Sequence, residues 1–200
     1  MRNKRFNMKK IFIVLLTFSF LGIFQANIFA KSINVDKRVE ELKNFYSLEK
    51  HVEGGYFSEI YTSPFTQNDR ATAGSIYFML VRNDISHFHK MDCDEIWYYH
   101  EGGGLRITMI NDGEVKQVLL GKDLKKNQQF IIVVPANTIF AAENIDKKSY
   151  TLISCATTPK FKYEYFQLVT KAELKSLYPQ VSEKILRLAY EKIPQFNSED

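Results

Sequence analysis

The sequence predicts an all-β domain of the sandwich or barrel class. Between Gly54 and Val169 it consists of roughly ten short runs rich in β-branched and aromatic residues, separated by turn-forming residues. No helical pattern interrupts these runs, which excludes a parallel α/β sheet. The Asp112-Gly113 pair between two apolar runs is the clearest hairpin signal, because glycine adopts a positive φ at little cost.

Helices are expected on both sides of this β region. At residues 35–47 apolar side chains recur at helical spacing, which predicts an N-terminal helix. The same spacing recurs at residues 171–193, where Pro179 divides the segment into two predicted C-terminal helices. No linker or repeat marks a second domain, so we expect one domain over residues 31–200, with its barrel at about 54–169.

The first thirty residues have the composition of a secretory signal peptide. Five basic and no acidic side chains precede the apolar run IFIVLLTFSFLGIF, and a small residue, Ala30, ends the segment. This pattern predicts cleavage after Ala30 and a secreted or periplasmic protein without membrane attachment. An uncleaved N-terminal anchor is the alternative, although the apolar run is short for a membrane span.

The charge of the chain depends on whether this leader is counted. The whole sequence carries 27 basic and 23 acidic side chains, a net charge of +4. Without the five basic residues of the leader, 22 basic side chains face 23 acidic ones, which gives −1. The excess of positive charge therefore belongs to the leader, and we expect no nucleic-acid partner.

The two cysteines, Cys93 and Cys155, are predicted to be free thiols. Export would allow a disulfide. However, two cysteines do not make a disulfide framework in a chain with a full core, and nothing in the sequence brings them together. We therefore expect two small buried residues.

The segment Ser86–Gly103, SHFHKMDCDEIWYYHEGG, carries three of the four histidines and the single tryptophan. If it forms a hairpin, His87 and His89 point to one side of their strand, and Glu95 lies across from them on the return strand. Such a group could bind Mn, Fe, Ni or Zn, or transfer a proton between histidine and carboxylate. A polar strand facing solvent is the alternative.

Aromatic and acidic side chains on the predicted strands supply further candidates for ligand binding. Glu53 and a glycine pair precede the first strand, which contains Tyr56 and Glu59. Rings elsewhere in the β region could wall a pocket and stack on a planar ligand or a sugar ring, namely Tyr77, Trp97, Tyr99 and Phe140. Ordinary core packing is the alternative for these rings.

These motifs resemble those of the cupin superfamily. A histidine pair followed by glutamate, with glycine seven positions later, resembles the first cupin motif, and Glu95 and Gly102 fit its spacing. The sequence PANTIFAAEN at residues 135–144 resembles the second motif. Phe140 stands there at the position where cupins usually have a third histidine ligand.

A narrower resemblance covers nearly the whole chain after the leader. The segments HVEGGYFSEIYTS, SHFHKMDCDEIWYYHEG, VVPANTIFAA and YTLISCATTPKFKYEYF follow the order of a small cupin branch, the Cupin_5 type, which usually lacks the third histidine. The resemblance implies an RmlC-like jelly roll, the cupin double-stranded β-helix, usually in a homodimer. It does not choose a reaction, because cupins include both enzymes and pure binders.

Two classes of function fit these observations. The first is an exported cupin that binds a small organic ligand, sugar-like or planar, in an aromatic pocket anchored by His87, His89 and Glu95. The second is an isomerase or epimerase that acts on a sugar-like substrate through a pocket histidine. A metal-dependent oxygenase is the third. Since Phe140 offers no lone pair, we expect His87, His89 and Glu95 to bind a divalent metal weakly or not at all, and we expect no other cofactor.

Overall fold

The computed structural model describes residues 34–195, so the predicted signal peptide lies outside the described residues. Residues 34–45 are helical, close to the predicted 35–47. Contacts group the chain from Glu41 onward into one compact unit that holds all the strands described below. No helix within residues 34–195 is both long enough and apolar enough to cross a membrane.

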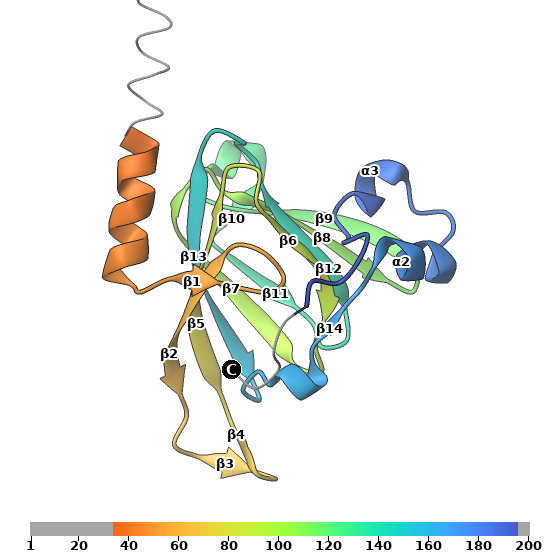
Figure 1. Cartoon of the computed structure of the whole chain (residues 1–200), viewed down its shortest axis with the longest axis horizontal. Helices are drawn as coiled ribbons and strands as arrows, with labels where there is room; N and C mark the ends of the chain where they lie inside the picture. Colours follow the sequence, from red (N-terminus) through yellow and green to blue (C-terminus); the bar gives the residue numbers. More distant parts are fainter. Residues whose placement is uncertain (1–33, 196–200) are drawn as a thin grey trace, which may run out of the picture. The chain divides into compact units, whose positions relative to one another are not determined.

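Two six-stranded sheets form this unit (Figure 1). In spatial order, the first sheet contains β1 (Glu49–Lys50), β2 (Tyr56–Thr62), β5 (Gly74–Val81), β13 (Tyr150–Thr158), β7 (Asp94–Gly102) and β11 (Ile131–Val134). The second contains β10 (Gln128–Gln129), β9 (Glu114–Leu120), β8 (Leu105–Asn111), β12 (Ile139–Asn144), β6 (Ile85–Lys90) and β14 (Gln167–Leu168). Neighbouring strands in both sheets are antiparallel, except that β10 runs parallel to β9.

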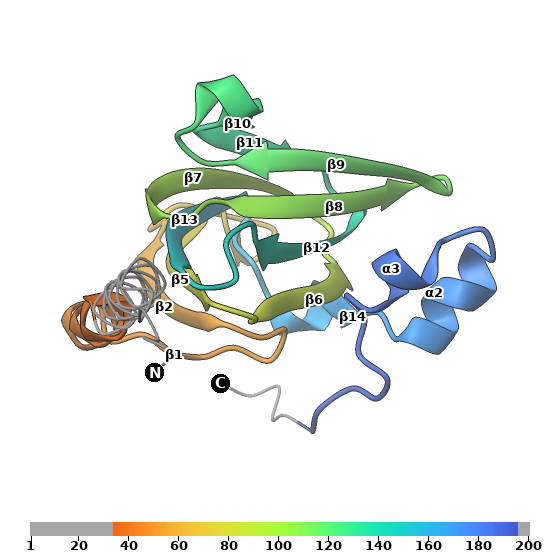
Figure 2. The ribbon, with the colours of Figure 1, turned by 90° about the horizontal axis from the view of Figure 1, so that it is seen from above.

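The remaining elements are short. A two-stranded arm is made of β3 (Thr66–Gln67) and β4 (Arg70–Ala71), and 3-10 turns lie at Leu124–Lys126 and Tyr163–Tyr165. After the β region come α2 (Lys171–Leu177) and α3 (Glu183–Leu186), on either side of Pro179 as predicted. Figure 2 shows the two sheets packed face to face, so the all-β jelly-roll prediction is confirmed.

Apolar side chains form two cores, one on each face of the second sheet. Residues alternate across a strand, so Ile107 of β8 joins the core between the sheets, whereas Ile110 joins the core beneath α2 and α3. Phe88 of β6 also faces the helices, with Leu174 of α2 and Leu186 of α3. The neighbour of Phe88 on β6, His89, therefore turns toward the space between the sheets.

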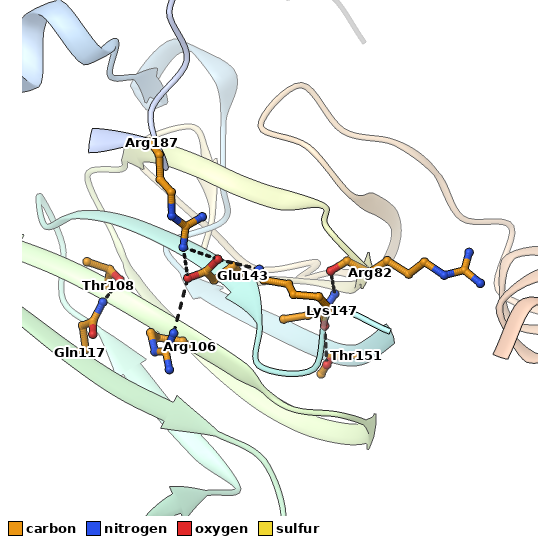
Figure 3. A network of polar contacts seen from close by, with 9 residues as sticks. Arg82, Arg106, Thr108, Gln117, Glu143, Lys147, Thr151 and Arg187 are labelled. Carbon is orange, nitrogen blue, oxygen red and sulfur yellow. Dashed lines mark hydrogen bonds and ion pairs between the residues drawn. The ribbon is translucent and has the colours of Figure 1, made fainter. Parts of the chain in front are cut away.

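An ion network attaches the C-terminal segment to the second sheet (Figure 3). Glu143 of β12 is almost fully buried, and Arg187, directly after α3, binds both of its carboxylate oxygens at 2.6 and 2.7 Å. Lys147 donates to the same carboxylate at 2.6 Å. Burial would raise the pKa of Glu143, but Arg187 and Lys147 hold it below its ordinary value.

The predicted Asp112-Gly113 hairpin is confirmed. Asn111 of β8 pairs with Glu114 of β9, which leaves a two-residue turn. Asp112 and Gly113 have φ values of 47° and 80°, and positive φ at both central residues is typical of the type I′ turn that matches the twist of a hairpin.

The hairpin prediction for Ser86–Gly103 is wrong. The strand that carries the histidines, β6, belongs to the second sheet, whereas β7 belongs to the first sheet between β13 and β11. The link between them buries the side chains of Met91 and Cys93 and exposes Asp92, and it carries the chain from one sheet to the other instead of turning back within one sheet. Glu95 therefore approaches the histidines from the opposite sheet.

Candidate functional site

A cavity of about 270 Å³ lies against the inner face of the first sheet. Strands β2, β5, β7 and β13 provide much of its wall. The rest comes from β1 and the loop before β2, from the link between β6 and β7, and from the loop after β13. Apolar surface dominates the wall, with five aromatic rings from Phe57, Phe78, Trp97, Phe161 and Tyr163. A concave, mostly apolar site with a few polar groups is the usual form of a small-molecule pocket.

Glu95 and Trp97 contribute the polar groups from β7. They are two residues apart, so both side chains point into the cavity, as strand alternation predicts. Within residues 34–195, neither Glu95 Oε2 nor Trp97 Nε1 has a hydrogen-bond partner, although both atoms are buried. Burial, together with the nearby charge of Glu53, raises the pKa of Glu95 to about 7.

Glu53, in the loop before β2, is a second buried carboxyl group in the same cavity. Ser86 donates a hydrogen bond to its Oε1 at 2.8 Å, and His51 Nδ1 and His89 Nε2 each lie 3.4 Å from its Oε2. Burial alone would raise the pKa of Glu53. The charges of His89 and His51, with hydrogen bonds from His51 and Ser86, instead bring it down to about 2.

Gly54 allows the Glu53 loop to lie directly on β6. Its φ is +109°, and a Cβ atom there would stand 2.1 Å from the carbonyl oxygen of Ile85, a contact that no other residue type could accept. This close approach lets the backbone N–H of His87 donate to the carbonyl of Glu53 at 2.8 Å. The glycine therefore places the Glu53 side chain beside His89.

The two histidines of β6 hold this loop and are not among the described residues that line the cavity. His87 Nδ1 lies 2.8 Å from the carbonyl oxygen of Glu53, and its ring stacks on Tyr190 at 3.6 Å between centroids. His89 donates from Nδ1 to the carbonyl of His87 at 2.7 Å and packs against Phe140 at 4.1 Å. Burial lowers the pKa of both histidines.

The predicted metal ligands His87, His89 and Glu95 do not fit a common ion. His87 turns to Tyr190, and His89 directs its Nε2 at Glu53. Within residues 34–195, no group of three or more His, Cys, Asp or Glu side chains is arranged to hold a metal ion.

The other predicted ligand-binding residues divide into two groups. Glu59 lines the cavity beside Glu53, Glu95 and Trp97, and it forms an ion pair with Lys160 at 2.8 Å. The structure does not place the remaining predicted rings among the described residues of the wall.

Each of these rings has another contact. Tyr56 lies under the ammonium of Lys50, and Tyr77 packs on Tyr46. Tyr99 donates its hydroxyl to the carbonyl of Gly102 at 2.8 Å, and Phe140 packs behind the wall on Trp97 and His89.

Several wall residues were not predicted as ligand-binding. His51 precedes Glu53 by two positions, and its place in the glycine-pair segment was the available signal. The loop after β13 contributes Lys160, Phe161 and Tyr163 to the wall. The sequence shows a cluster of aromatic residues there, but it does not show whether their side chains point toward a pocket. Cys155 and the other buried cysteine, Cys93, are free thiols, as predicted.

A jelly roll with a pocket on the inner face of one sheet defines a cupin-type protein, and the chain belongs to the Cupin superfamily (DUF985) family, whose model matches residues 40–169. It is 30% identical over 172 residues to the uncharacterized protein YML079W of Saccharomyces cerevisiae, an alignment that covers 76% of this chain and 85% of the yeast protein.

Solved structures show the same relationship. The chain is similar to the protein SO0799 from Shewanella oneidensis, with a TM-score of 0.73 and 33% identity over 76% of this chain and 98% of that one. It is also similar to a hypothetical protein from Leishmania major, with a TM-score of 0.70 and 30% identity over the same two shares.

Proposed function

We propose that this cupin binds a small organic molecule in the cavity and holds it through Glu95 and Trp97. The observation that supports this most directly is the pair of polar atoms, Glu95 Oε2 and Trp97 Nε1, buried beside an aromatic cavity without a partner in the described part of the chain. An unpaired buried polar group costs about 1–3 kcal/mol, so a molecule that pairs with both atoms recovers that free energy on binding.

Mass spectrometry of the purified protein tests this proposal. Under native conditions we expect a mass excess from a retained small molecule, and under denaturing conditions we expect that molecule to be released. The variant Ile76→Phe fills part of the cavity and should lose the molecule. Ile96→Phe makes the same change on β7 between the inward-facing Glu95 and Trp97, so it points to the other face of the sheet and should retain it.

An isomerase or epimerase is a second candidate, which the opposite pKa shifts of Glu53 and Glu95 favour. Near neutral pH a carboxylate and a partly protonated carboxyl group then share one cavity, an arrangement that can accept and return a proton at carbon. In this candidate function Glu95, which lines the cavity, transfers the proton in place of the histidine expected from the sequence.

Deuterium exchange tests this second candidate. Reducing sugars incubated with the protein in heavy water should incorporate deuterium next to the carbonyl carbon, and Glu95→Gln should stop that incorporation. If the protein retains a molecule but exchanges no carbon-bound hydrogen in any sugar, the binding function stands without the isomerase activity.

A further inference from the structure

The charged residues of the cavity wall are mostly acidic. Among the described lining residues, four glutamates, Glu49, Glu53, Glu59 and Glu95, face a single lysine, Lys160. An anionic ligand would enter against this charge, whereas a cationic one would be attracted.

Three of the four glutamates are already compensated or hydrated. Glu59 is paired with Lys160 at 2.8 Å. Glu53 is held by Ser86 and flanked by His51 and His89. Glu49 is exposed to solvent. Glu95 differs, because it is buried and its Oε2 has no partner in residues 34–195. A buried carboxylate is stabilised most by a positive charge placed next to it.

The rings around Glu95 suit the same kind of ligand. The faces of aromatic rings carry partial negative charge and attract organic cations, most strongly for tryptophan. Trp97 lies two residues from Glu95 on the same face of β7, and Phe57, Phe78 and Phe161 complete the apolar wall. An acidic group inside an aromatic wall is the arrangement that recognises ammonium groups.

We propose that the ligand of this cavity is an organic cation with a hydrogen-bond acceptor close to its charged nitrogen. The cationic nitrogen lies beside Glu95, and the acceptor takes the indole N–H of Trp97, which has no acceptor within the described chain. This inference rests on the proposed binding function and narrows its ligand to one chemical class.

Choline and its uncharged carbon isostere, in which a quaternary carbon replaces the nitrogen, are matched probes for this class. The carboxylate formed when the alcohol group of the isostere is oxidised is the anionic probe. Tetramethylammonium is a cationic probe without a hydrogen-bond acceptor. Trp97 is the single tryptophan of the chain, so its fluorescence reports on the cavity, and calorimetry measures the same binding independently. A quaternary nitrogen does not titrate, so the charge of the probe is constant.

We expect choline to bind at least about tenfold more tightly than its isostere, and the carboxylate to bind most weakly. Tetramethylammonium should bind more weakly than choline. Glu95→Gln keeps the shape of the side chain and should reduce choline binding about tenfold while changing that of the isostere less than about twofold. Glu95→Asp keeps the charge and should retain the preference for choline. Glu114→Gln, the same change on the exposed hairpin, is the control.

Equal or tighter binding of the isostere or the carboxylate would overturn the cationic class and leave the binding function intact. Choline binding that Glu95→Gln does not weaken, or no choline binding at millimolar concentration, would overturn it as well. The retained molecule sought by mass spectrometry decides the binding function separately, since that measurement does not depend on the charge of any probe.

Discussion

Glu95 and Glu53 share one cavity, yet their proton affinities differ because their neighbours differ. Glu53 accepts a hydrogen bond from Ser86 and lies beside two histidines, which favour its ionised form. For Glu95, burial and the negative charge of Glu53 raise the pKa more than the side chains of Trp97 and Cys155 lower it, so the protonated form is favoured. The stability that Glu53 contributes is therefore lost as pH falls, whereas the stability that Glu95 contributes is lost as pH rises.

Replacing Glu95 should change how stability depends on pH. Its pKa rises from 4.5 to about 7 on folding, so the stabilisation of the protonated form is complete below 4.5 and is lost as pH rises through 7. The loss amounts to about 3 kcal/mol in all. Glu95→Gln removes this titration. Urea unfolding across this pH range should show that the free energy of unfolding of the variant increases relative to that of the wild type as pH rises. If the two free energies change with pH in parallel, the raised pKa of Glu95 is contradicted.

Gly54 should tolerate no side chain. A Cβ atom would meet the Ile85 carbonyl oxygen at 2.1 Å, on a backbone with a φ of +109°, so Gly54→Ala should destabilise the protein by about 2 kcal/mol or more. Gly103 has no positive φ of this kind, and a Cβ there would meet its nearest neighbour, Asp146 Cβ, at 3.2 Å, so Gly103→Ala is the control. Thermal unfolding of both variants gives the comparison, and equal effects would show that the close approach to β6 is unimportant.

At the scale of elements, the edge of the first sheet at β2 is partly unpaired. Strand β1 pairs with β2 only at Tyr56 and Phe57, and farther along β2 Ile60 and Tyr61 are about half exposed. Exposed strand edges favour pairing with another strand. We therefore propose that the predicted homodimer forms along β2.

Light scattering tests the dimer. The protein should have the mass of two chains at micromolar concentration, and Ile60→Lys, which places a charge on this edge, should shift it to one chain. Val115→Lys, on an exposed position of β9, should leave the dimer intact. A wild-type monomer would contradict the proposal.

Prediction from sequence succeeded where local patterns determine the structure. Strand alternation alone places Glu95 and Trp97 on one face, and the Asp112-Gly113 pair gives its turn directly. The link between β6 and β7 was misread, because sequence spacing does not distinguish a turn within one sheet from a crossing between two. That error also hid the separation of His87 from the cavity.

At the scale of the whole molecule, the leader remains a prediction from its basic, apolar and small-residue pattern. Expression of the full chain in a host with a secretory pathway should yield protein outside the cytoplasm that begins near Lys31. N-terminal sequencing of the exported protein checks this, and an exported chain that still began at Met1 would contradict cleavage.

The central claim, that the cavity binds a ligand at Glu95 and Trp97, can be measured at one atom. Since Trp97 is the single tryptophan, its indole N–H gives one resonance in a nitrogen–proton NMR spectrum. Protein refolded from denaturant, and so freed of any retained molecule, should show this resonance at one position. Adding back the released small-molecule fraction should shift it, while Glu95→Gln should weaken that shift. An indole resonance that stays unchanged on this addition would contradict the account.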